Sequence, residues 1–432
     1  MTKLINSLKK MLLNGLYVML IAFFFAFLRG NRVQGVGHTV TSSSGSTYDY
    51  SSVEAAIDSS YINNGTLKLA YGDDVCLVFD KGYNITIDLN GYALTGAGCA
   101  PITVESGSLT IIGTGGIIFS LQSDAYSVVT VKSGAEFTLN SSTAYLKSIP
   151  YDTGLGIIRN LGTTNIYAGS LNNANDDMGL GIYNDTANSS DVTLNVTGGS
   201  NVSTDYSIYC SGGAGVCNVN ISGGTIKGQK TSIRIASGTA TNKLNITGGT
   251  LSNTYSQGYE VVNLEGTTTF TMKDGSIEQS SKWDYNALKF TRGVATVSGG
   301  TINGGIEMLG GSFTISGGAV VGRTFNWDYD THSDTIDGIC NGIIMTYGTF
   351  NLTGGSITGG ALTLTVDSSS SFKPTVSNSS NGIYATKGTI NISGGTIENG
   401  TISGATYTND NNHSRDSVSV KGTSSSKVNL NI

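Results

Sequence analysis

The sequence predicts an all-β fold, a parallel β-solenoid, and three observations lead to this prediction. The 432 residues include 60 glycines but only 3 prolines and 12% charged residues, so the chain is neither a highly charged disordered tail nor a low-complexity linker. A Gly-Gly phrase recurs at a nearly constant spacing. A short alternating strand precedes most copies of this phrase. A constant repeat of this kind is typical of chains whose coils stack on one another.

The chain begins with a segment that has the features of an export signal. Lys3, Lys9 and Lys10 precede an apolar run of 18 residues, 11–28. A basic start, an apolar middle and small residues near 33–35 are typical of a secretory signal peptide, although this run also reaches the lower limit for a membrane span. We therefore expect residues 1–35 to be a cleaved signal peptide or a retained N-terminal membrane anchor. In either case the rest of the chain is extracellular or at the cell surface.

The chain after residue 35 is acidic. It keeps 19 of the 24 basic residues and all 30 acidic residues, a net charge of −11. No run of Lys or Arg occurs in it. Because nucleic-acid binding depends on neutralising phosphates, we expect no nucleic-acid partner. We expect membrane contact only through the N-terminal segment.

Residues 36–60 are expected to form a linker and an N-terminal capping helix. Ser51-Ser-Val-Glu54 matches a capping box, which predicts a short helix from Val53 to Asp58 or slightly beyond. Such a helix would cover the first coil of a solenoid, whose strand edge would otherwise be open.

From residue 61 to residue 432, the Gly-Gly phrase defines the coils. It reads NITGGTL at 245–251 and NISGGTI at 391–397. Successive copies are 25, 25, 26, 25, 18, 37 and 40 residues apart, so one coil takes about 25 residues and the longer intervals hold insertions in one loop. The second glycines of the eight copies are Gly199, Gly224, Gly249, Gly275, Gly300, Gly318, Gly355 and Gly395.

Each coil contains a short strand, a turn, a second strand, the glycine corner, a third strand and a variable loop. The first strand alternates, as in Ser232-Ile-Arg-Ile, with Ile208, Ile233, Val262 and Leu288 on one face. Glycine suits the corner because the chain there needs positive φ angles and close approach between coils. No coil buries its apolar face alone, so we expect roughly 13 coils to stack with Ile, Val and Leu inside.

One polar position of the coil is often asparagine. Asn195, Asn220 and Asn245 precede successive glycine corners. Stacked asparagines form side-chain amide ladders in other stacked β-structures, and we expect one here. The same positions read N-x-S/T, which a eukaryotic secreted protein could glycosylate, but so regular a pattern follows from the repeat itself.

The chain has an odd number of cysteines, so at least one thiol stays unpaired if the others pair. Cys210 and Cys217 lie where neighbouring repeats have Ile or Leu. They are therefore expected to be buried apolar residues, with a disulfide between them as the alternative. The five cysteines are Cys76, Cys99, Cys210, Cys217 and Cys340.

The stretch NITIDLNGYALTG at 84–96 and the repeated SGGTI phrases are similar to coils of the pectin-lyase-like superfamily. The chain most resembles the exported, adhesin-like bacterial members, over nearly everything after residue 60. This resemblance implies a right-handed parallel β-helix. Enzymatic members use carboxylates on the outward face of one sheet, and the aligned column here has one carboxylate, so no catalytic residue is carried over. The column is Tyr183, Tyr209, Arg234, Asn263, Lys289 and Glu307.

Two aromatic loops are the candidate ligand-binding site. They lie two coils apart, and the coil between them is the shortest, with 18 residues. Aromatic faces beside carboxylates and amides suit sugars, so the loops predict a groove for a polysaccharide or a cell-surface glycan. The alternative is that the rings only pack the loops onto the rod. The candidate residues are Trp283, Asp284, Tyr285, Trp327, Asp328 and Tyr329.

The second of these loops is also acidic. Calcium prefers oxygen ligands, but the spacing of these carboxylates matches no EF-hand loop. We therefore expect no cofactor, and calcium bound by this loop is the alternative. The carboxylates in question are Asp328, Asp330, Asp334 and Asp337.

Three functions are weighed from these features. The export signal, the uniform repeats and the missing catalytic cluster favour an exported, non-enzymatic β-helix that acts as an adhesin-like or glycan-binding surface protein. A polysaccharide lyase or glycoside hydrolase of the same superfamily is the alternative. The sequence stops at Val428-Asn-Leu-Asn-Ile432, where other repeats continue into their corner. A partner or a missing domain is therefore expected at the last coil, and the chain could also be a structural spacer of a larger surface protein.

Overall fold

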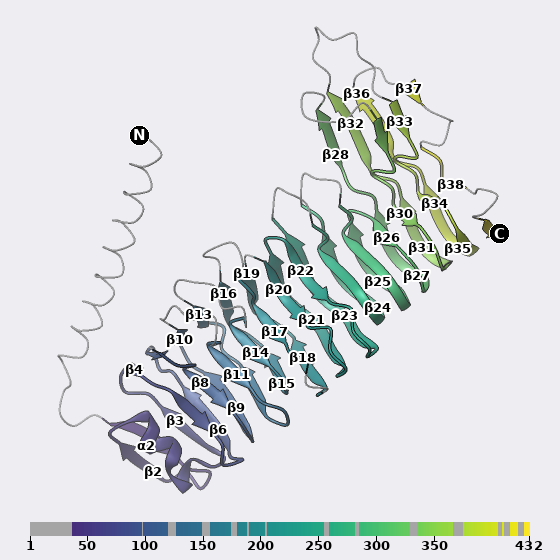
Figure 1. Cartoon of the computed structure of the whole chain (residues 1–432). Helices are drawn as coiled ribbons and strands as arrows, with labels where there is room; N and C mark the ends of the chain where they lie inside the picture. Colours follow the sequence, from purple (N-terminus) through teal and green to yellow (C-terminus); the bar gives the residue numbers. More distant parts are fainter. Residues whose placement is uncertain are drawn as a thin grey trace.

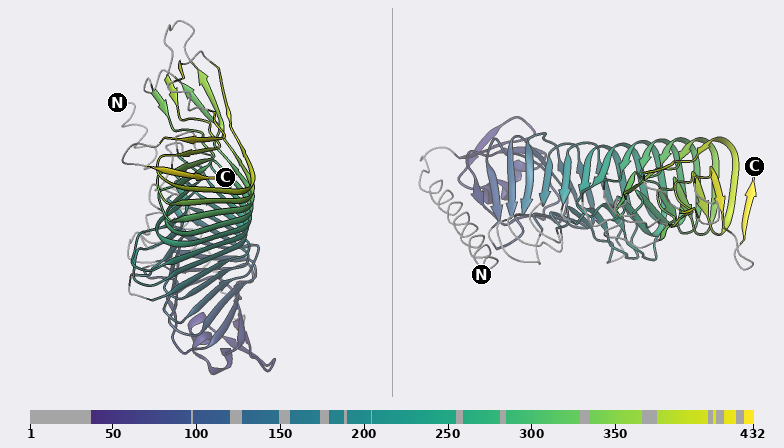
Figure 2. Two further views of the ribbon diagram at one scale, coloured as in Figure 1. Left: turned by 90° about the vertical axis from the view of Figure 1, so that its right-hand side faces the viewer. Right: turned by 90° about the horizontal axis from the view of Figure 1, so that it is seen from above.

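The computed structural model describes residues 37–96, 98–119, 127–148, 156–173, 179–187, 190–203, 205–254, 259–280, 285–328, 335–365, 375–404, 408–409, 415–421 and 427–432. These residues form a long parallel β-helix whose coils follow one another along the rod (Figures 1 and 2). The segment 1–35, predicted to be a signal or an anchor, lies outside the described residues. Within the described residues, no helix has both the length and the apolar character needed to cross a bilayer.

Three parallel ladders run along the rod. In the first, twelve successive pairings join thirteen strands. The described chain thus has thirteen coils, which confirms the predicted number. These strands are β5 (Leu77–Phe79), β8 (Ile102–Val104), β11 (Val129–Val131), β14 (Ile158–Asn160), β17 (Ile182–Asn184), β20 (Tyr206–Cys210), β22 (Thr231–Ile235), the first parts of β24 (Val262–Glu278) and β25 (Leu288–Asn303), β26 (Ile306–Met308), β30 (Ile343–Met345), β34 (Ile383–Ala385) and β38 (Val418–Val420).

The second and third ladders lie on either side of the glycine corner, and the longer strands continue through the corner from one ladder into the other. The second ladder consists of β3 (Gly65–Lys68), β6 (Asn84–Asp88), β9 (Ser108–Ile112), β12 (Glu136–Leu139), β15 (Thr163–Ile166), β18 (Val192–Val196), β21 (Cys217–Gly228), β23 (Asn242–Asn253), parts of β24 and β25, β27 (Ser312–Val321), β31 (Thr349–Thr358), β35 (Gly388–Glu398) and β39 (Val428–Asn431). The third consists of β4 (Asp73–Asp74), β7 (Ala93–Gly96), β10 (Gly115–Phe119), β13 (Ala144–Ser148), β16 (Ser170–Asn173), β19 (Ser200–Ser203) and the last parts of the long strands.

The core consists of columns of apolar side chains, one from each coil. Ile208, Ile233, Val262 and Leu288 pair in register along the first ladder and are fully buried, as predicted. This follows from the alternation of side chains in a strand, which directs every second residue inward. One continuous core therefore extends through the stacked coils.

The polar column on the second ladder forms the predicted amide ladder. The Nδ2 of Asn195 donates to Asn165 Oδ1, that of Asn220 to Asn195 Oδ1 and that of Asn245 to Asn220 Oδ1, each at 2.8 Å. The ladder resumes near the C-terminal end, where Asn391 donates to Asn351 at 2.7 Å. Asn195 and Asn220 each donate to one neighbouring coil and accept from the other, so the column helps to fix the register between coils.

The N-terminal cap contains more structure than predicted. Helix α2 spans Val53–Asp58, as expected, but its N-cap is Ser52, whose Oγ accepts a bond from Ala55 N at 3.2 Å. Before the helix, β1 (His38–Thr41) and β2 (Thr47–Tyr50) form an antiparallel pair, and η1 (Ser60–Ile62) follows it. Strand β1 also pairs antiparallel with β3. The first strand of the second ladder is thus covered by β1, which belongs to the part of residues 36–60 that the sequence predicted to be a linker.

The insertions of the last coils form a second structure beside the rod, which we call the side extension (Figures 1 and 2). Its strands stack into two parallel three-stranded sheets, where the sequence predicted variable loops. The corresponding insertions of successive coils are themselves in register, so their backbone groups pair like those of the rod. The sheets consist of β28 (Phe325–Asp328), β32 (Ala361–Thr365) and β36 (Thr401–Gly404), and of β29 (Thr335–Asp337), β33 (Thr375–Ser377) and β37 (Thr408–Asn409).

Four of the cysteines form disulfides. Cys76 is bonded to Cys99 and Cys210 to Cys217, with Cα atoms 5.9 Å and 6.2 Å apart. Cys210 and Cys217 are buried as predicted, but the interpretation as unbonded apolar residues is wrong, because the chain between them turns back and brings the two sulfurs together. Cys340 is a buried thiol.

Candidate functional site

The outward side chains of the first ladder form a column that we call the outer column. The strand register places Arg159, Tyr183, Tyr209, Arg234, Asn263, Lys289 and Glu307 next to one another on seven successive coils. The last six residues are those aligned from the sequence, in the same order. With neighbouring strands about 4.8 Å apart, the column is on the order of 29 Å long. It therefore presents polar and aromatic groups over a distance that suits an extended ligand.

An ion pair and a tyrosine stack occupy the N-terminal part of the column. Arg159 Nη2 lies 2.6 Å from Asp185 Oδ2. The rings of Tyr183 and Tyr209 stack with centroids 5.6 Å apart and planes inclined by 11°. Burial, and then the nearby Asp185, raise the pKa of the Tyr183 phenol above its usual value. The phenol is therefore protonated at neutral pH.

Arg234 connects the outer column to its neighbours. Its Nε and Nη2 each lie 3.1 Å from a carboxylate oxygen of Glu265, a fork geometry that fixes the guanidinium plane. Its Nη1 donates to the hydroxyl of Tyr206 at 2.9 Å, and its Cζ lies 5.2 Å and 5.7 Å from the ring centroids of Tyr206 and Tyr209. The cation thus has both a carboxylate and two aromatic rings as partners.

Lys289 lies between two carboxylates. Its Nζ is 3.3 Å from Glu260 Oε1 and 3.3 Å from Glu307 Oε2, so these two oxygens are at most twice that distance apart. Burial lowers the pKa of Lys289, but the two glutamates outweigh burial and the net pKa is raised. The amine and the two carboxylates thus form an ion-pair network.

A second column, the loop-base column, runs beside the first one at the ends of the variable loops. It consists of Asp205, Lys230, Tyr259 and Tyr285, each four residues before a member of the outer column. Lys230 pairs with Asp205, and its Nζ lies 6.0 Å from the Tyr259 ring centroid. Tyr259 stacks on Tyr285, with centroids 6.1 Å apart and planes inclined by 23°. Aligning the repeats did not predict this column, although the residues four positions before each member of the outer column would have indicated it.

Tyr285 ends the aromatic stack next to the shortest coil. Its side chain is 40% exposed. Tyr285 is thus one of the predicted ligand-binding residues, and its ring is accessible.

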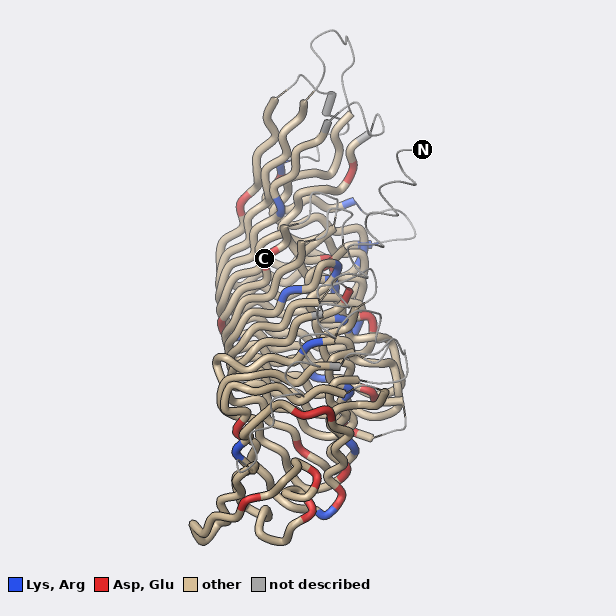
Figure 3. The backbone as a smooth tube through the Cα atoms, turned by 90° about the vertical axis from the view of Figure 1, so that its left-hand side faces the viewer, with Lys and Arg blue, Asp and Glu red and all other residues tan. Residues whose placement is uncertain are grey.

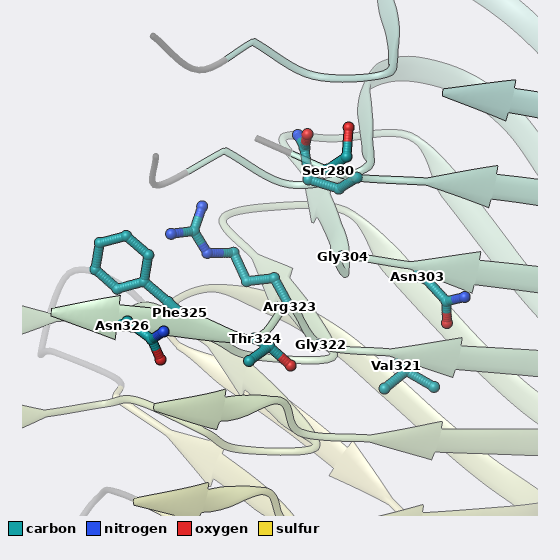
Figure 4. Close-up of a pocket in the computed structure, with 10 residues that line it drawn as sticks. Ser280, Asn303, Gly304, Val321, Gly322, Arg323, Thr324, Phe325 and Asn326 are labelled. Carbon is teal, nitrogen blue, oxygen red and sulfur yellow. The ribbon is translucent and has the colours of Figure 1, made fainter. Parts of the chain in front are cut away.

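A cavity of about 520 Å³ lies at the shortest coil (Figure 4). Arg323 extends toward it with only 5% of its surface exposed. Its guanidinium lies 4.3 Å from the Phe325 ring centroid, and its Nη1 donates to Tyr285 O at 3.4 Å. The cavity lies at the trimmed coil, but none of the six predicted ligand-binding residues is among the residues that line it. Its volume is in the range of small-ligand sites. It is lined by Gln279, Ser280, Asn303, Gly304, Val321, Gly322, Arg323, Thr324, Phe325 and Asn326.

The structure changes the interpretation of Trp327. Its side chain is 3% exposed and packs with Phe325, Leu362 and Leu364 in the core of the side extension. Here the alternative interpretation holds: this indole packs its own segment and does not offer a face to a sugar. Asp328 ends β28. The remaining predicted residues of the two loops, Trp283, Asp284 and Tyr329, lie outside the described residues.

The candidate calcium ligands are only partly described. Asp330 and Asp334 lie outside the described residues. Asp337 Oδ1 accepts hydrogen bonds from Ser377 Oγ at 2.7 Å and from Asn378 Nδ2 at 2.6 Å. This carboxylate therefore joins neighbouring coils of the side extension. Within the described ranges, no group of three or more His, Cys, Asp or Glu side chains is arranged to hold a metal ion.

Charged residues are unevenly distributed over the rod. Figure 3 shows long stretches of the stacked corner without a charged residue, and clusters of both signs elsewhere. In the two columns, cations and carboxylates occur together as ion pairs. No protein-family model, curated protein or solved structure matches this chain. The geometry of the columns and the cavity is therefore the basis for assigning a function.

Proposed function

We propose that this chain is an exported, non-enzymatic β-helix that binds a glycan at the cell surface, in the manner of an adhesin. The observation that carries the proposal is the pair of adjacent columns, which places stacked tyrosines, hydroxyls, amides and ion pairs side by side over seven coils and ends beside a cavity. A linear polymer lying along the rod would meet these groups coil after coil. Sugar-binding sites typically have a small number of polar groups with apolar ring surface between them.

The pairing of charges favours a ligand recognised through its hydroxyl groups. Arg159, Lys230, Arg234 and Lys289 each have a carboxylate partner. A charged ligand would have to compete with these internal partners. Hydroxyl groups can instead accept from a guanidinium and donate to a carboxylate without breaking the pair. We therefore infer an uncharged polysaccharide as the ligand of the two columns.

Export is supported by two features. The sequence of residues 1–35 has the order of a secretory signal peptide, with retention as a membrane anchor as the alternative. The two disulfides favour an oxidising compartment, because thiols in the cytosol are kept reduced.

The proposal is tested with a screen of uncharged polysaccharides against the purified protein and the variant Tyr209→Ala/Tyr285→Ala. We expect the variant to bind at least about tenfold more weakly, since it loses aromatic surface in both columns. The matched control is Tyr61→Ala/Tyr167→Ala, which removes two exposed tyrosines outside the columns and should bind within about twofold of the original. Equal losses in both variants, or no bound polysaccharide, would contradict the proposal and favour a structural spacer. Trp327→Ala is unsuitable here because this residue is buried.

A glycoside hydrolase, which uses two neighbouring carboxylates, is the second candidate, because Glu260 and Glu307 both contact Lys289 on the outer column. The same plates are therefore assayed for new reducing and unsaturated ends, with and without calcium. Product that disappears in Glu307→Gln would replace the binding proposal by an enzymatic one.

A further inference from the structure

Exposed basic residues from successive coils meet at the turn between the first and second ladders. Gly293, Gly311, Gly348 and Gly388 stack there: a Cβ on Gly311 would lie 2.6 Å from Gly293 O, one on Gly348 2.4 Å from Gly311 O, and one on Gly388 2.4 Å from Gly348 O. The residue before each glycine therefore stacks as well. These preceding residues are Arg292, Gly310, Tyr347 and Lys387.

The last coil extends this row. Gly388 pairs with Val428 in β39, so the preceding residues, Lys387 and Lys427, lie side by side. Lys421 lies near them, because its N donates to Ala385 O at 2.9 Å. All four cations and Tyr347 are exposed. We call this row the basic edge, and it consists of Arg292, Tyr347, Lys387, Lys421 and Lys427.

The basic edge lacks the internal charge pairing of the two columns. None of its four cations forms an ion pair within the described part of the chain. The residues before this row include Thr291, Thr346 and Thr386, those after the glycines include Ser312, Thr349 and Thr389, and none of these is a carboxylate. In the coil before Arg292, the carboxylate of Glu265 is paired with Arg234. In a chain with a net charge of −6, this edge is a local region of positive potential, which attracts anions.

Tyr347 adds an aromatic surface to the basic edge. Its side chain is 54% exposed. The Nζ of Lys387 lies 5.2 Å from its ring centroid. In the preceding coil the equivalent residue is Gly310, on which a Cβ would lie 3.8 Å from Tyr347 Cδ1. The Tyr347 ring thus has a cation beside it in the following coil and no side chain at the equivalent position of the preceding coil. The open side leaves room for a flat ligand group.

We propose that the basic edge binds a linear anionic polysaccharide, sulfated or carboxylated, that lies along the rod. Arg292 and Lys427 are four coils apart, about 19 Å, so one chain would contact several cations while a sugar ring packs on Tyr347. Nucleic acid fits less well, because DNA-binding proteins commonly neutralise about 6–10 phosphates and the edge offers four cations. This proposal is independent of the uncharged ligand proposed for the two columns, and either can fail alone.

The test compares binding of dextran sulfate and of uncharged dextran to the purified protein at several salt concentrations. We expect dextran sulfate to bind and its affinity to fall with salt, since bound counterions are released. Lys387→Gln/Lys427→Gln should weaken binding at least about tenfold at low salt and reduce the slope of log K against log salt by about two. Tyr347→Ala should weaken binding about threefold with the slope unchanged.

The matched control is Lys243→Gln/Lys273→Gln, which removes the same charge from exposed lysines on the second ladder and at the glycine corner. It should bind dextran sulfate within about twofold of the unmodified protein. Equal weakening by both lysine pairs would show that only the overall charge matters and would overturn the proposal. So would undetectable dextran sulfate binding, or tighter binding of oligo-dT or of phosphatidylglycerol vesicles than of dextran sulfate. None of these outcomes depends on whether the tyrosine variants of the two columns bind an uncharged glycan.

Discussion

In seven of the eight corners two glycines follow each other, and they are required for different physical reasons; in the remaining corner Asp274 takes the first position. The second glycines have φ between 77° and 90°, a region that other residues rarely adopt. At the first glycine the limit is space, since a Cβ on Gly223 would lie 2.3 Å from Thr197 O of the preceding coil. At the second, a Cβ on Gly224 would also meet Gly198 O at 2.7 Å. The second position therefore needs glycine both for its φ angle and for the close approach of the coils, whereas the first position is crowded in this coil but holds Asp274 in another.

Replacing Gly224 by alanine should destabilise the protein by more than the cost of the φ angle alone, which is about 1–2 kcal/mol. Gly45→Ala is the matched control, because Gly45 has nearly the same φ, 84°, but no atom within 4 Å of an added Cβ. The free energies of unfolding of both variants are measured by chemical denaturation. Equal losses would mean that contact between coils adds nothing to the requirement for glycine.

The side extension shows how an element depends on its stacking neighbours. Each inserted segment contributes only a short strand to each sheet, and none of these strands could bury its apolar side alone. When three insertions stack, Trp327, Ile336, Leu362, Leu364 and Val376 become the core of the extension. The element exists because three successive coils carry insertions of similar length.

Replacing Trp327 by alanine should therefore open the side extension without unfolding the rod. A buried Trp→Ala substitution typically costs about 3–5 kcal/mol, and here the loss falls on the small core of the extension. Hydrogen exchange of the amides in β28, β32 and β36 should accelerate, while those of β21 and β23 stay protected. Thr363→Ala, on the outward side of β32 between two core residues, is the control and should leave exchange unchanged. Global loss of protection in Trp327→Ala would show that the extension and the rod unfold as one unit.

At the scale of the whole molecule, the rod is a one-dimensional stack in which each coil contacts only its neighbours. The first coil of such a stack has an open strand edge, which can pair with another molecule. Here β1 pairs with β3, and α2 packs its buried residues Val53, Ala56 and Ile57 against the same end. The cap thus protects the N-terminal end of the rod from association.

Ala56→Glu should displace the cap, because Ala56 is fully buried and a carboxylate there would have no partner. The exposed end of the rod should then cause concentration-dependent self-association, which sedimentation or light scattering detects. Ala55→Glu places the same charge on the exposed neighbouring residue and should stay monomeric. A monomeric Ala56→Glu protein with an unchanged melting temperature would contradict this role of the cap.

The periodic features of the molecule follow from the sequence alone. The glycine spacing determines the thirteen coils, the alternation at Ile233 and Val262 determines the core, and aligning the repeats orders the outer column from Tyr183 to Glu307. These features repeat once per coil, so each copy supports the same prediction. For the same reason the amide ladder through Asn195 and Asn220 was predictable.

Other features depend on contacts between coils that no local pattern records. Trp327 is buried because two later insertions stack beside it, and the Cys210–Cys217 disulfide depends on the path of the chain between the two residues. The basic edge does not appear in the sequence as a run of basic residues. Arg292, Lys387 and Lys427 are distant in the chain and come together only when the coils stack. Residues whose role repeats with the coil are therefore set by the sequence. Which residues act together across insertions of unequal length is decided by the tertiary structure. The number of residues between them does not reveal which segments stack.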